Sequence, residues 1–151
     1  LWANNFEGML IAKLKYNEKG EVIAISEDSL LKFKTDGKMD KKISFPNSIS
    51  KVSAGNNFIV SIVENDDFYD IFIHDFNLKQ LGTAAIKTKP KGVFSHDDYF
   101  VLYDTDSLTL SNRQGKVTGI YESNIDINGA YISDDSSVYI ISNRKLQKLS
   151  L

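Results

Sequence analysis

Clusters of carboxylates recur along this 151-residue chain and are the first residues whose chemistry needs explaining. They are found at Asp66 and Asp67, at His96, Asp97 and Asp98, at Asp104 and Asp106, and at Asp134 and Asp135. Calcium would need several such oxygens converging from one loop or from neighbouring loops. None of the clusters has the D-x-D-x-D-G spacing of a calcium loop, and Asp, Asn and Ser fill tight turns because they bond the local backbone. We interpret the clusters as turn residues and predict no metal site.

The other reactive residue types do not form a catalytic set. His74 lies in a strand pattern and His96 in a turn, whereas a catalytic zinc site takes three protein ligands. The sequence has no G-x-S-x-G elbow, no P-loop and no G-x-G-x-x-G. It has no Cys, which excludes disulfides and thiolate metal sites. We therefore expect neither an enzyme nor a cofactor, and a hydrolase or lyase is the least favoured alternative.

Lysines and aromatic residues are the remaining binding candidates. The lysines gather at Lys32, Lys34, Lys38, Lys41 and Lys42, and again at Lys87, Lys89 and Lys91. They could form a weak surface for an anionic ligand. We favour the alternative, in which the lysines lie on edge strands and prevent these edges from pairing with other chains. The aromatic residues crowd the middle of the chain, at Phe58, Phe68, Tyr69, Phe72, Phe94, Tyr99, Phe100 and Tyr103. Most should pack in the core, and a few exposed ones would form a recognition patch.

The elements that carry these residues are short strands in a repeated order. Val22 to Lys38 has an apolar run, an acidic turn, a second apolar run and a turn at Thr35-Asp36-Gly37-Lys38, and Phe100 to Lys116 repeats this order. The apolar runs open at Val22, Ile59, Val101 and Tyr139, a recurrence of 37 to 42 residues. No long amphipathic helix is indicated, so the chain is predicted to be all-β. Four strands per ~40 residues favour radial repetition.

The pattern of two apolar runs closed by a Gly-Lys turn, at Gly37-Lys38 and Gly115-Lys116, resembles the blades of β-propeller repeat proteins. It is most similar to bacterial WD40-like and quinoprotein-like blades. The chain lacks the Trp-Asp and Gly-His landmarks of WD40 blades and the Trp-docking motif of quinoproteins, so cofactor binding does not follow from the resemblance. The resemblance implies one domain, 1–151, of about four blades with four antiparallel strands each. The expected blades are 8–46, 49–88, 91–122 and 125–151, the last completed by 1–5.

Two arrangements of such blades remain open. Segment 1–5 resembles residues 121–125, which end one expected blade and begin the next, so 1–5 could supply the missing strand of the fourth blade and close a ring. Closure would remove exposed sheet edges. Alternatively, the chain is half of a larger ring, truncated or paired with a second copy.

The composition narrows the classes of molecule that the chain is expected to bind. A net charge of −2 gives no field that would recruit nucleic acid or an anionic membrane. No run approaches the ~20 apolar residues of a membrane span. The chain starts at Leu1 and not at Met, so we expect a processed product or a piece of something longer.

We therefore expect a scaffold module that binds a protein or peptide and could form a homodimer. The alternative is an extracytoplasmic carbohydrate- or cell-wall-binding domain of a bacterial protein. A contiguous aromatic-aliphatic patch would favour a protein partner, and aromatic platforms beside carboxylates or amides would favour sugar.

Overall fold

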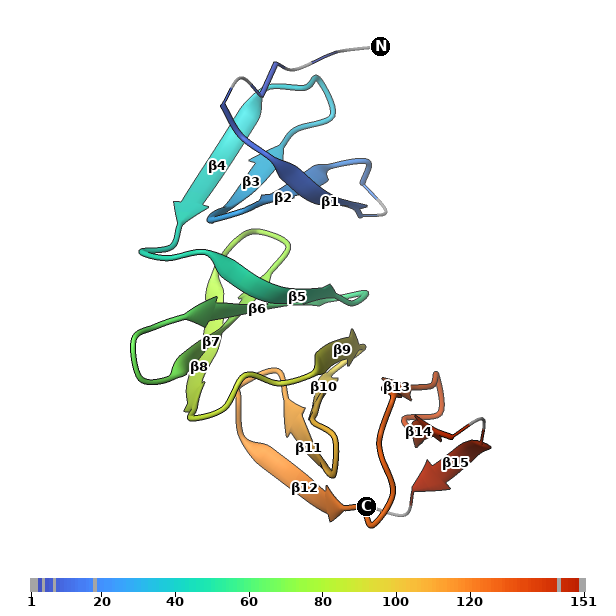
Figure 1. The fold of residues 1–151 in the computed structure, drawn as a ribbon. Helices are drawn as coiled ribbons and strands as arrows, with labels where there is room; N and C mark the ends of the chain where they lie inside the picture. Colours follow the sequence, from blue (N-terminus) through green and yellow to red (C-terminus); the bar gives the residue numbers. More distant parts are fainter. Residues whose placement is uncertain (1–2, 4, 7, 18, 144, 150–151) are drawn as a thin grey trace.

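The computed structural model describes residues 3, 5–6, 8–17, 19–143 and 145–149, and it contains only strands, turns and bends in this part of the chain. The strands form four antiparallel sheets arranged one after another along the chain (Figure 1). The all-β, propeller-like fold class predicted from the sequence is confirmed. Each sheet has the meander order of a propeller blade, so we refer to the sheets as blades 1 to 4.

Blade 1 contains β1 (Ile11–Tyr16), β2 (Val22–Ser26), β3 (Ser29–Phe33) and β4 (Met39–Ser44). Blade 2 contains β5 (Ile49–Ala54), β6 (Phe58–Glu64), β7 (Tyr69–Asp75) and β8 (Gln80–Ile86). Blade 3 contains β9 (Gly92–His96), β10 (Tyr99–Tyr103), β11 (Ser107–Asn112) and β12 (Val117–Glu122). Blade 4 has three strands in the described residues: β13 (Gly129–Ile132), β14 (Val138–Ser142) and β15 (Lys145–Leu149). Pro46 and Pro90 fall between blades, where no ladder needs their missing N–H.

Antiparallel order places alternate turns of every blade on the same side of the molecule. The turn between the first and second strands and the turn between the third and fourth strands lie at one end of each sheet. We call this side the turn face; the described residues of its turns are 17 and 19–21, 34–38, 55–57, 76–79, 97–98, 113–116 and 133–137. The remaining turns and the connections between blades lie on the opposite face.

Apolar side chains fill the spaces between successive blades. We call the side of a blade that faces the next blade along the chain its trailing face, and the other side its leading face. Ile23 and Ile25 on the trailing face of blade 1 pack with Ile59 on the leading face of blade 2. The trailing face of blade 2 packs on Phe100 and Leu102 of blade 3. Val101 of blade 3 packs with the leading face of blade 4. Alternation along each strand supplies one core on each side.

The four blades form an open arc, with blade 1 and blade 4 at its two ends (Figure 1). No strand of blade 1 pairs with a strand of blade 4 among the described residues. Leu1, Trp2 and Asn4 of the segment predicted to close a ring lie outside the described residues. The neighbouring Phe6 packs edge-on against Phe33 of blade 1, with ring centroids 5.7 Å apart. The structure therefore shows an arc, and no ring closure is found in the described part.

Lys32 differs from the edge role predicted for it. It lies on β3, an interior strand of blade 1, and only 4% of its surface is exposed. Its Nζ donates to Asn77 Oδ1 of blade 2 at 2.9 Å and lies 3.1 Å from Glu21 Oε1. A buried ammonium requires such partners because desolvation would otherwise expel it. Lys41 and Lys42 do lie on β4, the outermost strand.

In the part of the chain that the structure describes, no helix is long and apolar enough to cross a membrane.

Candidate functional site

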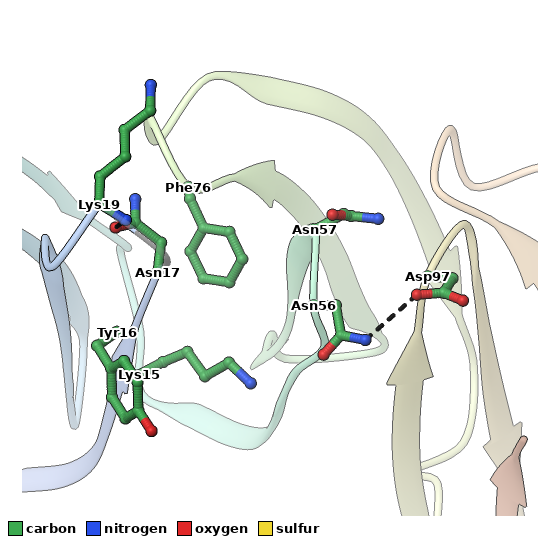
Figure 2. A pocket seen from close by; sticks show the side chains of 8 residues that line it. All are labelled: Lys15, Tyr16, Asn17, Lys19, Asn56, Asn57, Phe76 and Asp97. Carbon is green, nitrogen blue, oxygen red and sulfur yellow. Dashed lines mark hydrogen bonds between the residues drawn. The ribbon is translucent and has the colours of Figure 1, made fainter. Parts of the chain in front are cut away.

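A cleft of about 590 Å³ opens on the turn face across blades 1, 2 and 3 (Figure 2). Its lining residues come from four turns or strand ends that meet there: Lys15, Tyr16, Asn17, Lys19, Asn56, Asn57, Phe76 and Asp97. The site thus combines two ammonium groups, three amides, two aromatic rings and one carboxylate. Because the turns belong to successive repeats, the arc of blades is what brings them together.

Blade 1 contributes the cationic side of the cleft. Lys15 and Tyr16 end β1, and the turn that follows is held by Asn17. Asn17 Oδ1 accepts the backbone N–H groups of Lys19 and Glu21, each at 3.0 Å. Such side-chain-to-backbone bonds stabilise a tight turn. These bonds hold the backbone at Lys19, which lines the cleft.

Blades 2 and 3 contribute the amide and carboxylate side. Asn56 Nδ2 donates to Asp97 Oδ1 at 3.2 Å, a contact between two blades that is visible in Figure 2. Beneath it, Ser95 Oγ and Ser95 N both donate to Ser53 Oγ at 2.9 Å. Gly55 permits this approach, because a Cβ there would lie 2.9 Å from the Ser95 carbonyl oxygen. The turns of blades 2 and 3 are consequently fixed against each other.

His96 extends the anionic side of the site to blade 4. Its Nε2 lies 3.0 Å from Asp134 Oδ1 and 3.4 Å from Asp97 Oδ2, and only 17% of its side chain is exposed. Neither carboxylate is in line with the ring nitrogen for a hydrogen bond. Two of the sequence-predicted clusters, around Asp97 and around Asp134, therefore meet at the ends of β9 and β13. His74, by contrast, lies in the core between blades 1 and 2.

The remaining carboxylate clusters serve their own turns or lie on the opposite face. Asp104 Oδ1 accepts the Thr105 N–H at 2.7 Å. Asp135 accepts the Ser137 N–H at 3.1 Å and a hydroxyl bond from Ser133, and bonds from Ser133 and Ser137 hold its carboxyl pKa well below the usual range. Asp66 lines a shallow depression on the opposite face with Glu64. Within the described residues, no group of three or more His, Asp and Glu side chains is placed to hold a metal ion.

Charge is distributed unequally along the cleft. Lys15 and Lys19 lie at the blade 1 end, and Asp97 lies at the blade 3 end with Asp134 beyond it. The amides of Asn56 and Asn57 stand between them, and the rings of Tyr16 and Phe76 line the side nearer blade 1 (Figure 2). Such a surface can hold an extended ligand that carries both charges and has polar groups between them.

Sequence reasoning found only the carboxylate part of this site. Lys15, Tyr16 and Phe76 were not singled out, because nothing in their own segments distinguishes them from ordinary strand ends. The available signal was positional: they sit at the turn-face ends of their blades, as the flagged Asp97 does. Aligning the repeats by the positions of their turns would have placed Lys15, Tyr16 and Phe76 in one group with Asp97.

The fold is shared with solved propeller structures. One is a structure of BBS1N in complex with ARL6DN, with a TM-score of 0.69, 8% sequence identity, and coverage of 93% of this chain and 51% of that chain. BamB from Moraxella catarrhalis matches with a TM-score of 0.60 and 12% identity, covering 90% of this chain and 41% of that one. A protein of unknown function from Bacteroides caccae matches with a TM-score of 0.61 and 9% identity, covering 96% and 58%.

These likenesses show a β-propeller-like fold and, at such identities, nothing beyond the fold. The chain spans about half the length of the structures it matches. No curated protein matches the sequence. The model of one protein family, described as "Family of unknown function (DUF5711)", matches residues 2–151.

Proposed function

The chain belongs to the DUF5711 family, a family of unknown function, and we propose that it is a non-enzymatic module that binds a peptide segment of a partner protein in the turn-face cleft. The observation that carries this proposal is the charge arrangement of the cleft, with Lys15 and Lys19 at one end and Asp97 at the other. A peptide supplies both charges along one extended chain.

The side chains between the charges suit a polypeptide backbone. The amides of Asn56 and Asn57 each offer both a donor and an acceptor, which is what peptide N–H and C=O groups require. Phe76 and Tyr16 add apolar surface for one larger side chain, since aromatic residues contribute strongly at interfaces. The hydrogen bonds that hold the turn at Asn17 and that join Ser53 to Ser95 reduce the ordering cost of binding. The BBS1N propeller, whose structure is of a complex with ARL6DN, offers a propeller precedent for protein binding.

Selection of random twelve-residue peptides on the immobilised protein tests the proposal. Selected peptides should carry both an acidic and a basic residue, and their affinity should fall at least tenfold in Lys15→Glu and in Asp97→Lys. The matched control is Lys13→Glu, which makes the same charge change on the same strand outside the cleft. Thermal melts of all variants would show that the fold is retained. Peptides that bind all three variants equally would contradict the proposal.

Carbohydrate binding is the second candidate, and it rests on the aromatic rings. Tyr16 is 77% exposed, and it lies with Phe76 beside amide side chains and near a carboxylate. An exposed ring can stack on a sugar while neighbouring amides bond its hydroxyls. A glycan array separates the two functions. Sugar binding should be lost in Tyr16→Ala and should be insensitive to salt, whereas peptide binding through paired charges should weaken as salt rises.

A further inference from the structure

Asp97 is the carboxylate of the turn-face cleft, and a histidine lies directly beside it. Asp97 Oδ2 is 3.4 Å from Nε2 of His96, while Asp97 Oδ1 accepts a hydrogen bond from Asn56 at 3.2 Å (Figure 2). Histidine is the side chain that ordinarily gains or loses its charge between about pH 5 and pH 8. The charge at this end of the cleft can therefore change with pH.

A second carboxylate approaches the same ring from blade 4. Asp134 Oδ1 lies 3.0 Å from His96 Nε2, in the turn that follows β13. The Nε2 atom is covered from solvent, so the two carboxylates, and not water, are the groups next to it. Two negatively charged side chains from different blades thus share one imidazole.

The other charged groups around this histidine are already paired. In the turn of blade 3, Asp98 lies 3.2 Å from Arg113. In the turn of blade 4, Asp135 lies 3.6 Å from Lys148. Within the described residues, the two carboxylates beside His96 make no other ion pair. The neighbours on β10 and in the turn between β5 and β6 are a phenol and two amides: Tyr99, Asn56 and Asn57.

A proton on His96 therefore changes how the anionic end of the cleft meets a cation. With a neutral ring, two negative charges lie close together, and one of them lines the cleft. With a protonated ring, one of these charges is compensated, and both carboxylates are attracted to the ring. A basic side chain of a ligand and the proton thus compete for the same carboxylates, and each lowers the affinity for the other.

We propose that His96 makes ligand binding in the turn-face cleft pH-dependent, and that protonation of its ring weakens the binding of a basic side chain at the anionic end. This inference rests on the peptide-binding function proposed above, because it concerns the regulation of the same site. His96 is a positioning residue here, since it acts through Asp97 and Asp134. Only this end of the cleft is affected, because no histidine lines the blade 1 end.

Calorimetric titration at pH 8 and at pH 5.5 tests the proposal. The probe is a twelve-residue peptide selected at pH 8 that contains no histidine and has acetylated and amidated ends. Side-chain carboxyls ordinarily titrate near about pH 4 and lysine near about pH 10, so histidine is the side chain whose charge changes in this interval. The dissociation constant should be about three- to tenfold higher at pH 5.5, as expected of one unit charge a few ångströms away near a protein surface. Binding between these pH values should release protons, so the measured heat should depend on the ionisation enthalpy of the buffer.

Variants that fix the charge of the side chain make the test specific. His96→Gln stays neutral, so its dissociation constant should be the same at both pH values. His96→Arg stays charged, so its affinity should be low at both. The matched control is His74→Leu, which removes the other histidine of the chain, in the core between blades 1 and 2. It should keep the pH dependence of the wild type. Thermal melts at both pH values would show that each variant is folded.

The outcomes separate this proposal from the one on which it rests. A peptide that binds the wild type equally at both pH values would overturn the pH dependence and leave peptide binding intact. A pH dependence that persists in His96→Gln would overturn it as well, because another group would then cause the change. If no selected peptide bound at either pH value, the peptide-binding function would be contradicted, and the regulation inferred for it would fail with it.

Discussion

His74 is a buried histidine that the fold holds in its neutral form. It lies on β7, is 2% exposed, and faces blade 1, where its ring is 6.0 Å from the Phe45 ring. Its Nδ1 has no hydrogen-bond partner among the described residues. Burial lowers the pKa of His74 below its usual value of 6.5, and the nearby charge of Lys41 lowers it further.

The free energy of unfolding should therefore fall as the pH drops below about 6.5, the ordinary histidine value. In that range the unfolded chain binds a proton at His74 that the folded chain resists, so acid favours unfolding until the folded-state pKa is passed. Urea denaturation between pH 5 and pH 8 measures this slope, which His74→Leu should reduce. His96→Gln is the control, because it removes the other histidine and leaves the His74 contribution in place. An unchanged slope in His74→Leu would show that the carboxylates alone cause it.

The contrast between Lys32 and Asp104 shows what the sequence can predict at this scale. Asp104 was expected to bond its own turn, and it does, because the partner N–H is one residue away. Lys32 was expected at an edge but is buried against Asn77, a partner 45 residues away. A rule about neighbouring residues predicts only contacts between residues that are close together in the sequence. The cleft residues Lys15 and Phe76 escaped prediction for the same reason, since only the arrangement of blades joins them.

At the scale of elements, the start of β1 shows where alternation of apolar residues misleads. Read for hydrophobicity, the apolar run from Gly8 to Tyr16 predicts one strand, whereas β1 begins at Ile11. Gly8 has a φ of +75°, and Met9 N donates to Phe6 O at 2.9 Å, so the chain is still turning at these residues. The hydrophobicity of these residues alone does not reveal that the chain turns here. The apolar run that opens at Val22 does coincide with β2 (Val22–Ser26), because turn residues mark both of its ends.

Contact between blades 2 and 3 depends on Gly82 of β8. A Cβ at this position would lie 2.3 Å from the backbone oxygen of Gln114, in the turn between β11 and β12. We expect Gly82→Ala to destabilise the fold by about 1–3 kcal/mol, because backbone cannot move aside as a flexible side chain can. Gly129→Ala is the control: its Cβ would lie 3.6 Å from Ile141, an ordinary contact. Urea midpoints of the two variants measure the difference, and equal midpoints would mean that the turn of blade 3 shifts at no cost.

At the scale of the whole molecule, blade 2 has a neighbouring blade on both faces, whereas each end blade has a neighbouring blade on one face only. Ile59 and Val63 of β6 pack toward blade 1, while Phe58, Val60 and Ile62 pack toward blade 3. Blade 4 shares one apolar core with blade 3, and Leu146 is exposed on its other side. Blade 1 shares one core with blade 2 and has a small second core on its other side, where Phe6 packs on Phe33, while Leu14 beside it is exposed. Local opening costs most where most apolar surface is covered.

Amide hydrogen exchange should therefore be slowest in β6 and become faster toward both ends of the arc, with β1 and β15 exchanging first. Mass spectrometry of exchanged peptides separates these strands. If β15 exchanged as slowly as β6, protection would not follow the amount of apolar surface that covers each strand, and the expected gradient from β6 outward would be contradicted.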